Sequence, residues 1–134
     1  MTLEKRTQRD VLICDDDKNI CEILKVYCEH MGCFKSIVFA HDGITATQKL
    51  RNQKFALVLL DIDMPKKSGY DLLGDIEIGG VNSKESILVV SGTLEKDLIA
   101  KIIQNGVKHF MVKPFDEQNF QEKVLKILNT KAIA

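Results

Sequence analysis

The chain has 134 residues, of which 45% are hydrophobic and 28% are charged, and its 19 basic residues balance 19 acidic ones. This length and composition are typical of one soluble globular domain, and they exclude a disordered chain, a secreted mini-protein and a multidomain enzyme. Zero net charge argues against direct binding of nucleic acid, and the longest apolar run, at residues 55–60, is too short to cross a bilayer.

Four short apolar runs stand out along the chain, and a weaker fifth run follows them. They lie at residues 11–14, 37–40, 56–60, 87–90 and 110–112. The runs are continuous rather than alternating, which is typical of strands buried on both faces of a parallel sheet. We therefore expect five β-strands.

The segments between and after these runs show helical spacing of their apolar residues. They lie at residues 20–27, 43–50, 70–78, 94–103 and 120–128. Five strand–helix units in alternation predict a single α/β domain, a doubly wound parallel sheet with helices on both faces. We expect an N-terminal arm at 1–9, the domain at 10–129 and a C-terminal tail at 130–134.

The four cysteines all lie in the first quarter of the chain, as Cys14, Cys21, Cys28 and Cys33. None forms a CxxC pair, so the spacing of a zinc site or a thioredoxin-like motif is missing. We expect small buried thiols in a reducing compartment. The charged N-terminus lacks the pattern of a secretory signal, and we expect a cytoplasmic protein with no membrane partner.

Candidate site residues, most of them polar, follow each apolar run, at the strand ends where open α/β sheets bind ligands. They are Asp15, Asp16 and Asp17 after the first run, His41 and Asp42 after the second, Asp61 and Asp63 after the third, Ser91, Gly92 and Thr93 after the fourth, and Lys113 and Pro114 after the fifth. Because parallel strands end at one edge, several carboxylates and one ammonium are expected to meet there.

A cluster of carboxylates repels itself unless protons or a cation compensate. Oxygen ligands without Cys or His suit Mg²⁺, and Mg²⁺ beside a lysine is the charge arrangement that a phosphoryl group needs. We expect Asp17 to cap the first helix instead of binding the metal. The histidines, His30, His41 and His109, form no i, i+4 pair, and we expect no metal or phosphotransfer role for them.

Four motifs now occur in order at the predicted strand ends: VLICDDD, LVLLDIDMPKKSG, ILVVSG and MVKPF. Together they closely resemble the receiver domains of response regulators of the CheY type, over about residues 10–129. This resemblance implies the flavodoxin-like fold, with strand order 2-1-3-4-5 and five helices.

The resemblance also implies a role for each site residue. Asp61 would accept the phosphoryl group and, like Asp15, Asp16 and the backbone carbonyl of Asp63, take part in metal binding. The remaining implied roles are those of Lys113 as the phosphate-pairing lysine, Ser91 as the switch hydroxyl, Gly92 as the small residue beside the phosphate, Phe110 as the switch aromatic, and Pro114 as the partner of Lys113 in a cis peptide.

The implied function is Mg²⁺-dependent acceptance of a phosphoryl group from a sensor histidine kinase or phosphotransfer protein. Phosphorylation would switch a docking surface on the fourth helix, fifth strand and fifth helix for a downstream protein target that the sequence does not name. The fourth helix has a wide apolar face, and any part of it left exposed would mark that surface. We expect a monomer or weak dimer that catalyses only its own phosphorylation and dephosphorylation.

Two alternatives remain open. A pseudo-receiver would bind partners without taking phosphate, although every chemical position of the motif set is filled. A haloacid-dehalogenase-like phosphatase is suggested by the DxD spacing of Asp61 and Asp63, but a full β-α-β-α unit precedes it here. The residues favour a stand-alone regulator over a receiver within a longer protein, and no nucleotide-binding motif is present.

Overall fold

The computed structural model describes residues 9–76, 81–92 and 95–133, with side chains described as far as residue 129. Most of the predicted arm at 1–9, Thr93 and Leu94 therefore lie outside the described residues. A five-stranded parallel sheet runs through the molecule in the order β2-β1-β3-β4-β5. Its strands are β1 Asp10–Cys14, β2 Ser36–Ala40, β3 Leu57–Leu60, β4 Ile87–Ser91 and β5 His109–Val112. The predicted topology is confirmed.

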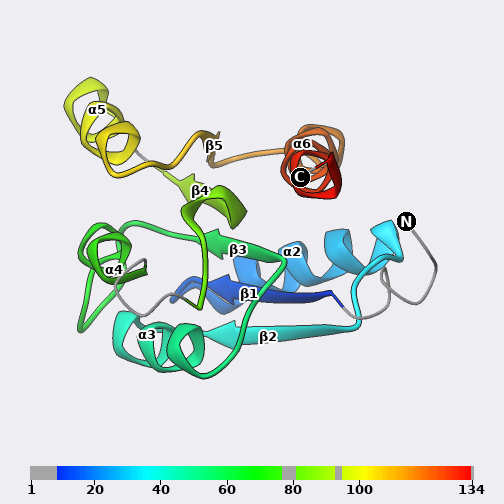
Figure 1. The fold of residues 1–134 in the computed structure, drawn as a ribbon, viewed down its shortest axis with the longest axis horizontal. Coiled ribbons are helices and arrows are strands. Elements are labelled where there is room, and N and C mark those ends of the chain that lie inside the picture. Colours follow the sequence, from blue (N-terminus) through cyan, green and yellow to red (C-terminus); the bar gives the residue numbers. More distant parts are fainter. Residues whose placement is uncertain (1–8, 77–80, 93–94, 134) are drawn as a thin grey trace.

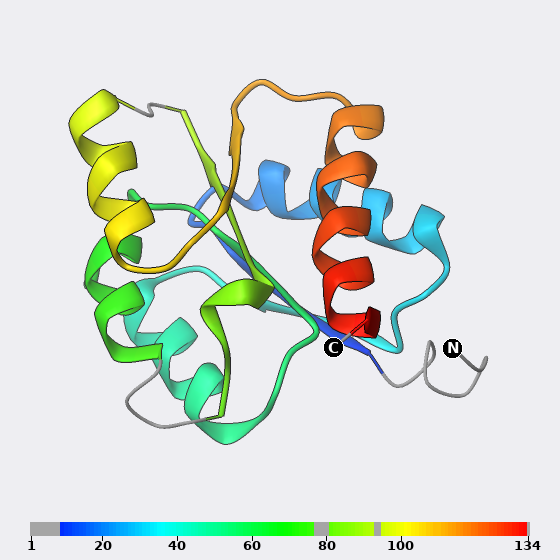
Figure 2. The same cartoon turned by 45° about the horizontal axis from the view of Figure 1, so that its top comes forward.

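Helices cover both faces of this sheet (Figure 1). In the described residues they are α2 Lys18–Met31, α3 Gly43–Asn52, α4 Gly69–Ile76, α5 Lys96–Gln104 and α6 Glu117–Ile133, with a short 3₁₀ helix at Lys84–Ser86. The turned view in Figure 2 shows α2 and α6 together on one face, while α3, α4 and α5 lie on the other. The doubly wound arrangement predicted from the apolar spacing is thus confirmed.

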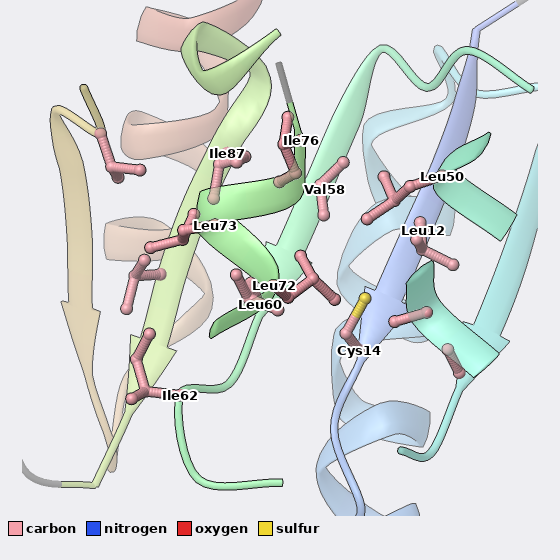
Figure 3. Close-up of a cluster of buried hydrophobic side chains, with 14 of the residues drawn as sticks. Leu12, Cys14, Leu50, Val58, Leu60, Ile62, Leu72, Leu73, Ile76 and Ile87 are labelled. Atoms are coloured by element: carbon pink, nitrogen blue, oxygen red, sulfur yellow. The ribbon is translucent and has the colours of Figure 1, made fainter. Parts of the chain in front are cut away.

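The pleat of the strands divides the core into two clusters. In β1, Leu12 and Cys14 point into the cluster under α3, α4 and α5, whereas Val11 and Ile13 point into the cluster under α2 and α6. Figure 3 shows the first cluster, where Leu60 and other strand side chains face the buried side of α4. Burial on both sides explains why the central strands are apolar without interruption.

The two edge strands depart from the expectation of complete burial. In β2, Ser36 is exposed and the next three residues are half-buried, and in β5 only Met111 is buried. An edge strand has a neighbour on one side only, so its side chains are covered less completely than those of β1, β3 and β4. An apolar run alone does not distinguish a central strand from an edge strand.

Two aspartates cap the N-termini of helices, and the first of them, Asp17, is predicted from the sequence. Asp17 caps α2, accepting from Asn19 N at 2.9 Å, and Asp42 caps α3 through Thr45 N at 2.8 Å. α5 ends at Gln104, shortly before Gly106, whose φ of +97° is a left-handed conformation that favours glycine.

The C-terminal tail predicted at 130–134 is wrong for residues 130–133, because α6 continues to Ile133. Asn129 and Thr130 are weak helix formers, but neither Gly nor Pro follows them and Lys131 and Ala132 favour helix. Three of the four cysteines are buried free thiols, as expected, whereas Cys33 is only half-buried. Among the described residues, no helix is long and apolar enough to cross a membrane.

Candidate functional site

Backbone hydrogen bonds beyond the strands bring the strand ends into register. The N–H of Asp15 donates to the carbonyl of Ala40, the last residue of β2, at 3.1 Å. The N–H of Asp61 donates to the carbonyl of Cys14 at 2.9 Å. At the other side of the sheet, the N–H of Lys113 donates to the carbonyl of Ser91 at 2.9 Å. The residues after β1, β3, β4 and β5 are therefore held at one edge, as predicted.

Three carboxylates meet at this edge. Asp15, Asp16 and Asp61 each offer an oxygen, and these oxygens lie within 4.8 Å of one another. Asp15 and Asp61 are buried, whereas Asp16 is exposed. The cluster is thus closed on the side of the sheet and open to solvent at Asp16.

Lys113 supplies the positive charge of the site. Its Nζ lies 2.7 Å from Asp15 Oδ2 and 3.5 Å from Asp61 Oδ2. Burial by itself would lower the pKa of Lys113, but the hydrogen bond to Asp15 and the charge of Asp61 raise it overall. The lysine therefore stays protonated and holds the two buried carboxylates together.

The pKa of Asp61 is raised from 3.8 to about 6. Burial is the main cause and the charge of Asp15 adds to it, while Lys113 acts in the opposite direction. One ammonium does not neutralise three neighbouring carboxylates. The excess negative charge would be relieved by a further cation.

The donor set fits Mg²⁺. The three clustered groups are carboxylates, which are hard oxygen ligands, and the exposed side at Asp16 leaves room for the waters that Mg²⁺ retains. The residues present are therefore compatible with the metal that the sequence suggests.

Two further aspartates near the cluster donate backbone hydrogen bonds to its carboxylates. The N–H of Asp63 donates to Asp61 Oδ1 at 3.2 Å, and the N–H of Asp17 donates to Asp15 Oδ1 at 2.9 Å. The side chain of Asp17 is occupied as the cap of α2, as predicted, and lies outside the carboxylate cluster. Both backbone groups help to fix the orientation of the clustered carboxylates.

The remaining predicted residues surround the same edge. Ser91 is buried at the end of β4, and a Cβ on Gly92 would meet no atom within 4 Å, so this residue borders open space. Phe110 is half-buried against the cluster under α5. The peptide bond between Lys113 and Pro114 is cis, as the resemblance implies.

Two glycines near the site have a role that the sequence analysis did not single out. A Cβ on Gly69 would lie 2.4 Å from the carbonyl oxygen of Asp61, and one on Gly43 would lie 1.9 Å from that of Lys67. Both glycines therefore allow the segment after β3 to pass close to neighbouring backbone. The "SG" at the end of the LVLLDIDMPKKSG motif was the available signal for Gly69.

Comparison with known proteins agrees with this geometry. Residues 11–125 match the family model described as the response regulator receiver domain. The chain belongs to the response regulator receiver domain family. The receiver domain assignment confirms the resemblance found in the sequence and replaces the phosphatase alternative. Receiver domains are generally signalling domains of two-component systems and not enzymes in their own right.

Curated relatives include both short and longer regulators. The chain is 32% identical to the chemotaxis protein CheY of Pseudomonas aeruginosa over 117 residues, 87% of this chain and 94% of that protein. It is 33% identical to the transcriptional regulatory protein MalR of Bacillus subtilis over 112 residues, 84% of this chain. The match covers 47% of MalR, so this receiver domain spans about half the length of that relative.

A solved structure shows the same fold. A chain in the crystal structure of the CheX–CheY–BeF₃–Mg²⁺ complex from Borrelia burgdorferi superposes with a TM-score of 0.78 and 29% identity. The superposition covers 89% of this chain and 88% of that one. The flavodoxin-like fold, with strand order 2-1-3-4-5, is therefore shared with proteins of the family.

Proposed function

We propose that this receiver domain accepts a phosphoryl group on Asp61 in a Mg²⁺-dependent reaction. The observation that carries the proposal is the grouping of Asp61 with Asp15 and Asp16 within 4.8 Å, beside the ammonium of Lys113. A buried carboxylate flanked by two others and one lysine is suited to a transferring phosphoryl group, which needs charge neutralisation.

In the reaction, a carboxylate oxygen of Asp61 attacks phosphorus and forms an acyl phosphate. The bond that breaks is the P–N bond of a phosphohistidine on a sensor kinase or phosphotransfer protein, and the imidazole leaves. With acetyl phosphate as a small donor, the P–O bond breaks and acetate leaves. Asp61 reacts in its ionised form. Because its pKa of about 6 lies below neutral pH, most molecules carry the ionised carboxylate at pH 7.

The other site residues would hold the metal ion, orient the phosphoryl group and neutralise its negative charge. Asp16 would hold the metal directly, Asp15 through water, and the backbone carbonyl of Asp63 would complete the protein ligands. Mg²⁺, when bound, supplies positive charge to the phosphoryl oxygens. Lys113 pairs with one of those oxygens, Ser91 donates a hydrogen bond, and Gly92 leaves space for the group.

The output surface that we propose lies on α5, β5 and α6, the predicted fourth helix, fifth strand and fifth helix. Ile103 of α5 is 55% exposed and Val112 of β5 is 49% exposed, so apolar surface remains there after folding. Phe110, a residue of β5, packs against the core cluster under α3, α4 and α5. A hydrogen bond from Ser91 to the phosphate, with Phe110 moving inward, would give the two states different surfaces.

The function is tested by incubating the protein with Mg²⁺ and acetyl phosphate and recording its intact mass. We expect the mass of one phosphoryl group to be added in the wild type, and none when Mg²⁺ is removed by a chelator. Asp61→Asn should gain no mass, whereas Asp71→Asn, which changes an exposed aspartate of α4, should behave as the wild type.

A folded wild type that binds Mg²⁺ but gains no mass would leave two explanations, a pseudo-receiver or a short-lived phosphate. Beryllofluoride, which occupies the phosphoryl position without hydrolysis, separates them. Amide NMR shifts on α5 and β5 after its addition would support the switch, with Ile23 and Val26 of α2 as exposed controls. No response to beryllofluoride would favour the pseudo-receiver and overturn the proposal.

The cellular setting follows from this proposal. The phosphoryl donor would be a sensor histidine kinase or phosphotransfer protein, and the receiver would act on a downstream protein in the cytoplasm. The Borrelia burgdorferi complex shows CheY with CheX, BeF₃ and Mg²⁺, which supports the choice of cofactor and of probe for this chain.

A further inference from the structure

The backbone carbonyl oxygen of Asp15, a residue of the carboxylate cluster, is contacted by two side chains. His41 Nδ1 lies 3.0 Å from it, and the thiol of Cys21 donates to it at 3.3 Å. The two groups come from different elements, since Cys21 is in α2 and His41 directly follows β2. Two side chains far apart in sequence therefore hold one backbone oxygen of the site.

His41 is held in place by its neighbours. Its ring is half-buried and stacks on Phe39, with ring centroids 5.9 Å apart and an interplanar angle of 26°. A carbonyl oxygen only accepts hydrogen bonds, so Nδ1 must carry the proton that is donated to Asp15. The contact thus selects the form of the imidazole in which Nδ1 is protonated.

Cys21 contacts the same oxygen beside His41, and its Sγ lies 3.8 Å from His41 Nδ1. It is buried, and burial together with the charge of Asp15 raises the pKa of its thiol to about 12. The thiol therefore keeps its proton and remains a weak donor. The stronger of the two donors is the imidazole of His41.

Contacts from four parts of the chain fix Asp15. Its N–H donates to the end of β2, its carbonyl accepts from His41 and Cys21, Oδ1 accepts from the N–H of Asp17, and Oδ2 accepts from Lys113. The carbonyl belongs to the same planar peptide unit as the N–H of Asp16. Holding this oxygen therefore sets the direction in which the chain continues to Asp16.

We propose that His41 is a positioning residue for the metal site, acting through the carbonyl of Asp15 to place the exposed carboxylate of Asp16. The inference rests on the proposed Mg²⁺-dependent function. Replacing a residue that hydrogen-bonds to a metal ligand, and so orients it, commonly weakens metal binding by about tenfold or more. The role assigned to His41 needs its N–H, and it does not need the imidazole to bind metal or to carry the phosphoryl group.

The test compares Mg²⁺ affinities by calorimetry at pH 8. His41→Phe keeps a ring against Phe39 but has no N–H, and we expect it to bind Mg²⁺ about tenfold more weakly. His41→Asn can donate from a position close to that of Nδ1, and we expect it to bind within about threefold of the wild type. His30→Phe is the matched control, because His30 pairs with Glu117 away from the site, and its affinity should be unchanged.

The outcomes separate this inference from the function on which it rests. Equal affinity in wild type and folded His41→Phe would overturn the positioning role and leave the proposed function intact. Equal weakening in His41→Asn and His41→Phe would also overturn it, because the N–H would then be irrelevant. A wild type that binds no Mg²⁺ would overturn the proposed function itself.

A second measurement needs neither metal nor a folded variant. Nitrogen-15 NMR of the metal-free wild type at pH 8 reports which ring nitrogen of His41 carries the proton. We expect the proton on Nδ1 and a bare Nε2. A bare Nδ1 would overturn the proposal, because the hydrogen bond to Asp15 would then lack its donor.

Discussion

The carbonyl oxygen of Asp61 lies only 2.4 Å from the position that a Cβ on Gly69 would occupy. The start of α4 is therefore packed directly against the backbone of Asp61, the proposed phospho-acceptor, and the N–H of Gly69 donates to the carbonyl of Ile62 at 2.8 Å. A side chain at this position cannot be accommodated without moving the segment that carries Asp61 and Asp63.

Gly69→Ala is expected to lower the free energy of unfolding by about 1–3 kcal/mol, the usual cost of forcing extra atoms into a packed site. It should also slow phosphoryl transfer from acetyl phosphate, because the backbone of Asp61 must shift. Chemical denaturation and intact-mass kinetics measure the two effects. An unchanged free energy of unfolding and an unchanged phosphorylation rate would show that the segment after β3 can shift at little cost and contradict the prediction.

Gly74→Ala is the matched control within the same helix. Gly74 is exposed, and a Cβ there would meet no atom within 4 Å. Alanine in a helix interior is favoured over glycine by about 1 kcal/mol, so this variant should be more stable than the wild type with an unchanged phosphorylation rate. Destabilisation by both variants would indicate that α4 itself, and not contact with Asp61, is sensitive.

Lys66 is expected to be replaceable by glycine with a gain in stability. Its φ is +68°, a left-handed conformation that costs a residue with a Cβ about 1 kcal/mol. Its ion pair with Asp42 is long, at 3.7 Å, and the lysine side chain is largely exposed, so the pair contributes little. Lys66→Gly should raise the free energy of unfolding by about 1 kcal/mol, whereas Lys66→Ala, which keeps the Cβ, should not. Equal effects of the two substitutions would assign the change to the lost charge.

Asp61→Asn is expected to stabilise the metal-free protein at neutral pH. The pKa of Asp61 is raised from 3.8 to about 6, so between these values the folded state binds more protons and stability falls as pH rises. This shift corresponds to about 3 kcal/mol at pH 7, which the asparagine variant would not lose. The advantage of the variant should vanish near pH 4 and shrink at pH 7 when Mg²⁺ is added. Thermal unfolding from pH 4 to 8 measures it, and a constant advantage would contradict the raised pKa.

Lys113→Met should lower the free energy of unfolding, and the loss should be largest at neutral pH without Mg²⁺. Without the ammonium, the buried carboxylates of Asp15 and Asp61 lose their partner, which costs about 3–5 kcal/mol at neutral pH. The pKa of Asp61 should rise further, since Lys113 lowers it in the wild type, and acid or Mg²⁺ should restore part of the stability. Lys67→Met removes a pair with Asp75, whose pKa lies below 3.8, so its cost should be flat from pH 5 to 8. A flat cost for Lys113→Met as well would contradict its role in the cluster.

Much of the fold could be predicted because each central strand is an uninterrupted apolar run followed by a polar residue. Asp15, Asp61 and Lys113 are identifiable for a related reason: each follows an apolar run, and parallel strands end together. The carboxylate cluster follows from chain order and topology alone.

Other features depend on distances between segments, which a single sequence does not specify. The contact of His41 with Asp15 is not predictable from spacing, because Asp15 lies 26 residues earlier and is contacted through its backbone. The half-exposure of β2 and β5 follows from strand order, because the edge positions have one neighbour only. The end of α6 was misplaced because helix propensity changes gradually around Asn129.

The ion pair between Asp15 and Lys113 joins residues 98 positions apart, at opposite ends of the domain. During synthesis on the ribosome, the carboxylates of Asp15 and Asp61 emerge well before the lysine that neutralises them. A nascent chain that lacks β5 would hold these carboxylates without their counter-charge, and we expect it to be a poor phosphoryl acceptor. The ability to accept a phosphoryl group would thus arise only when β5 has joined the sheet, so that chains still being synthesised are not phosphorylated.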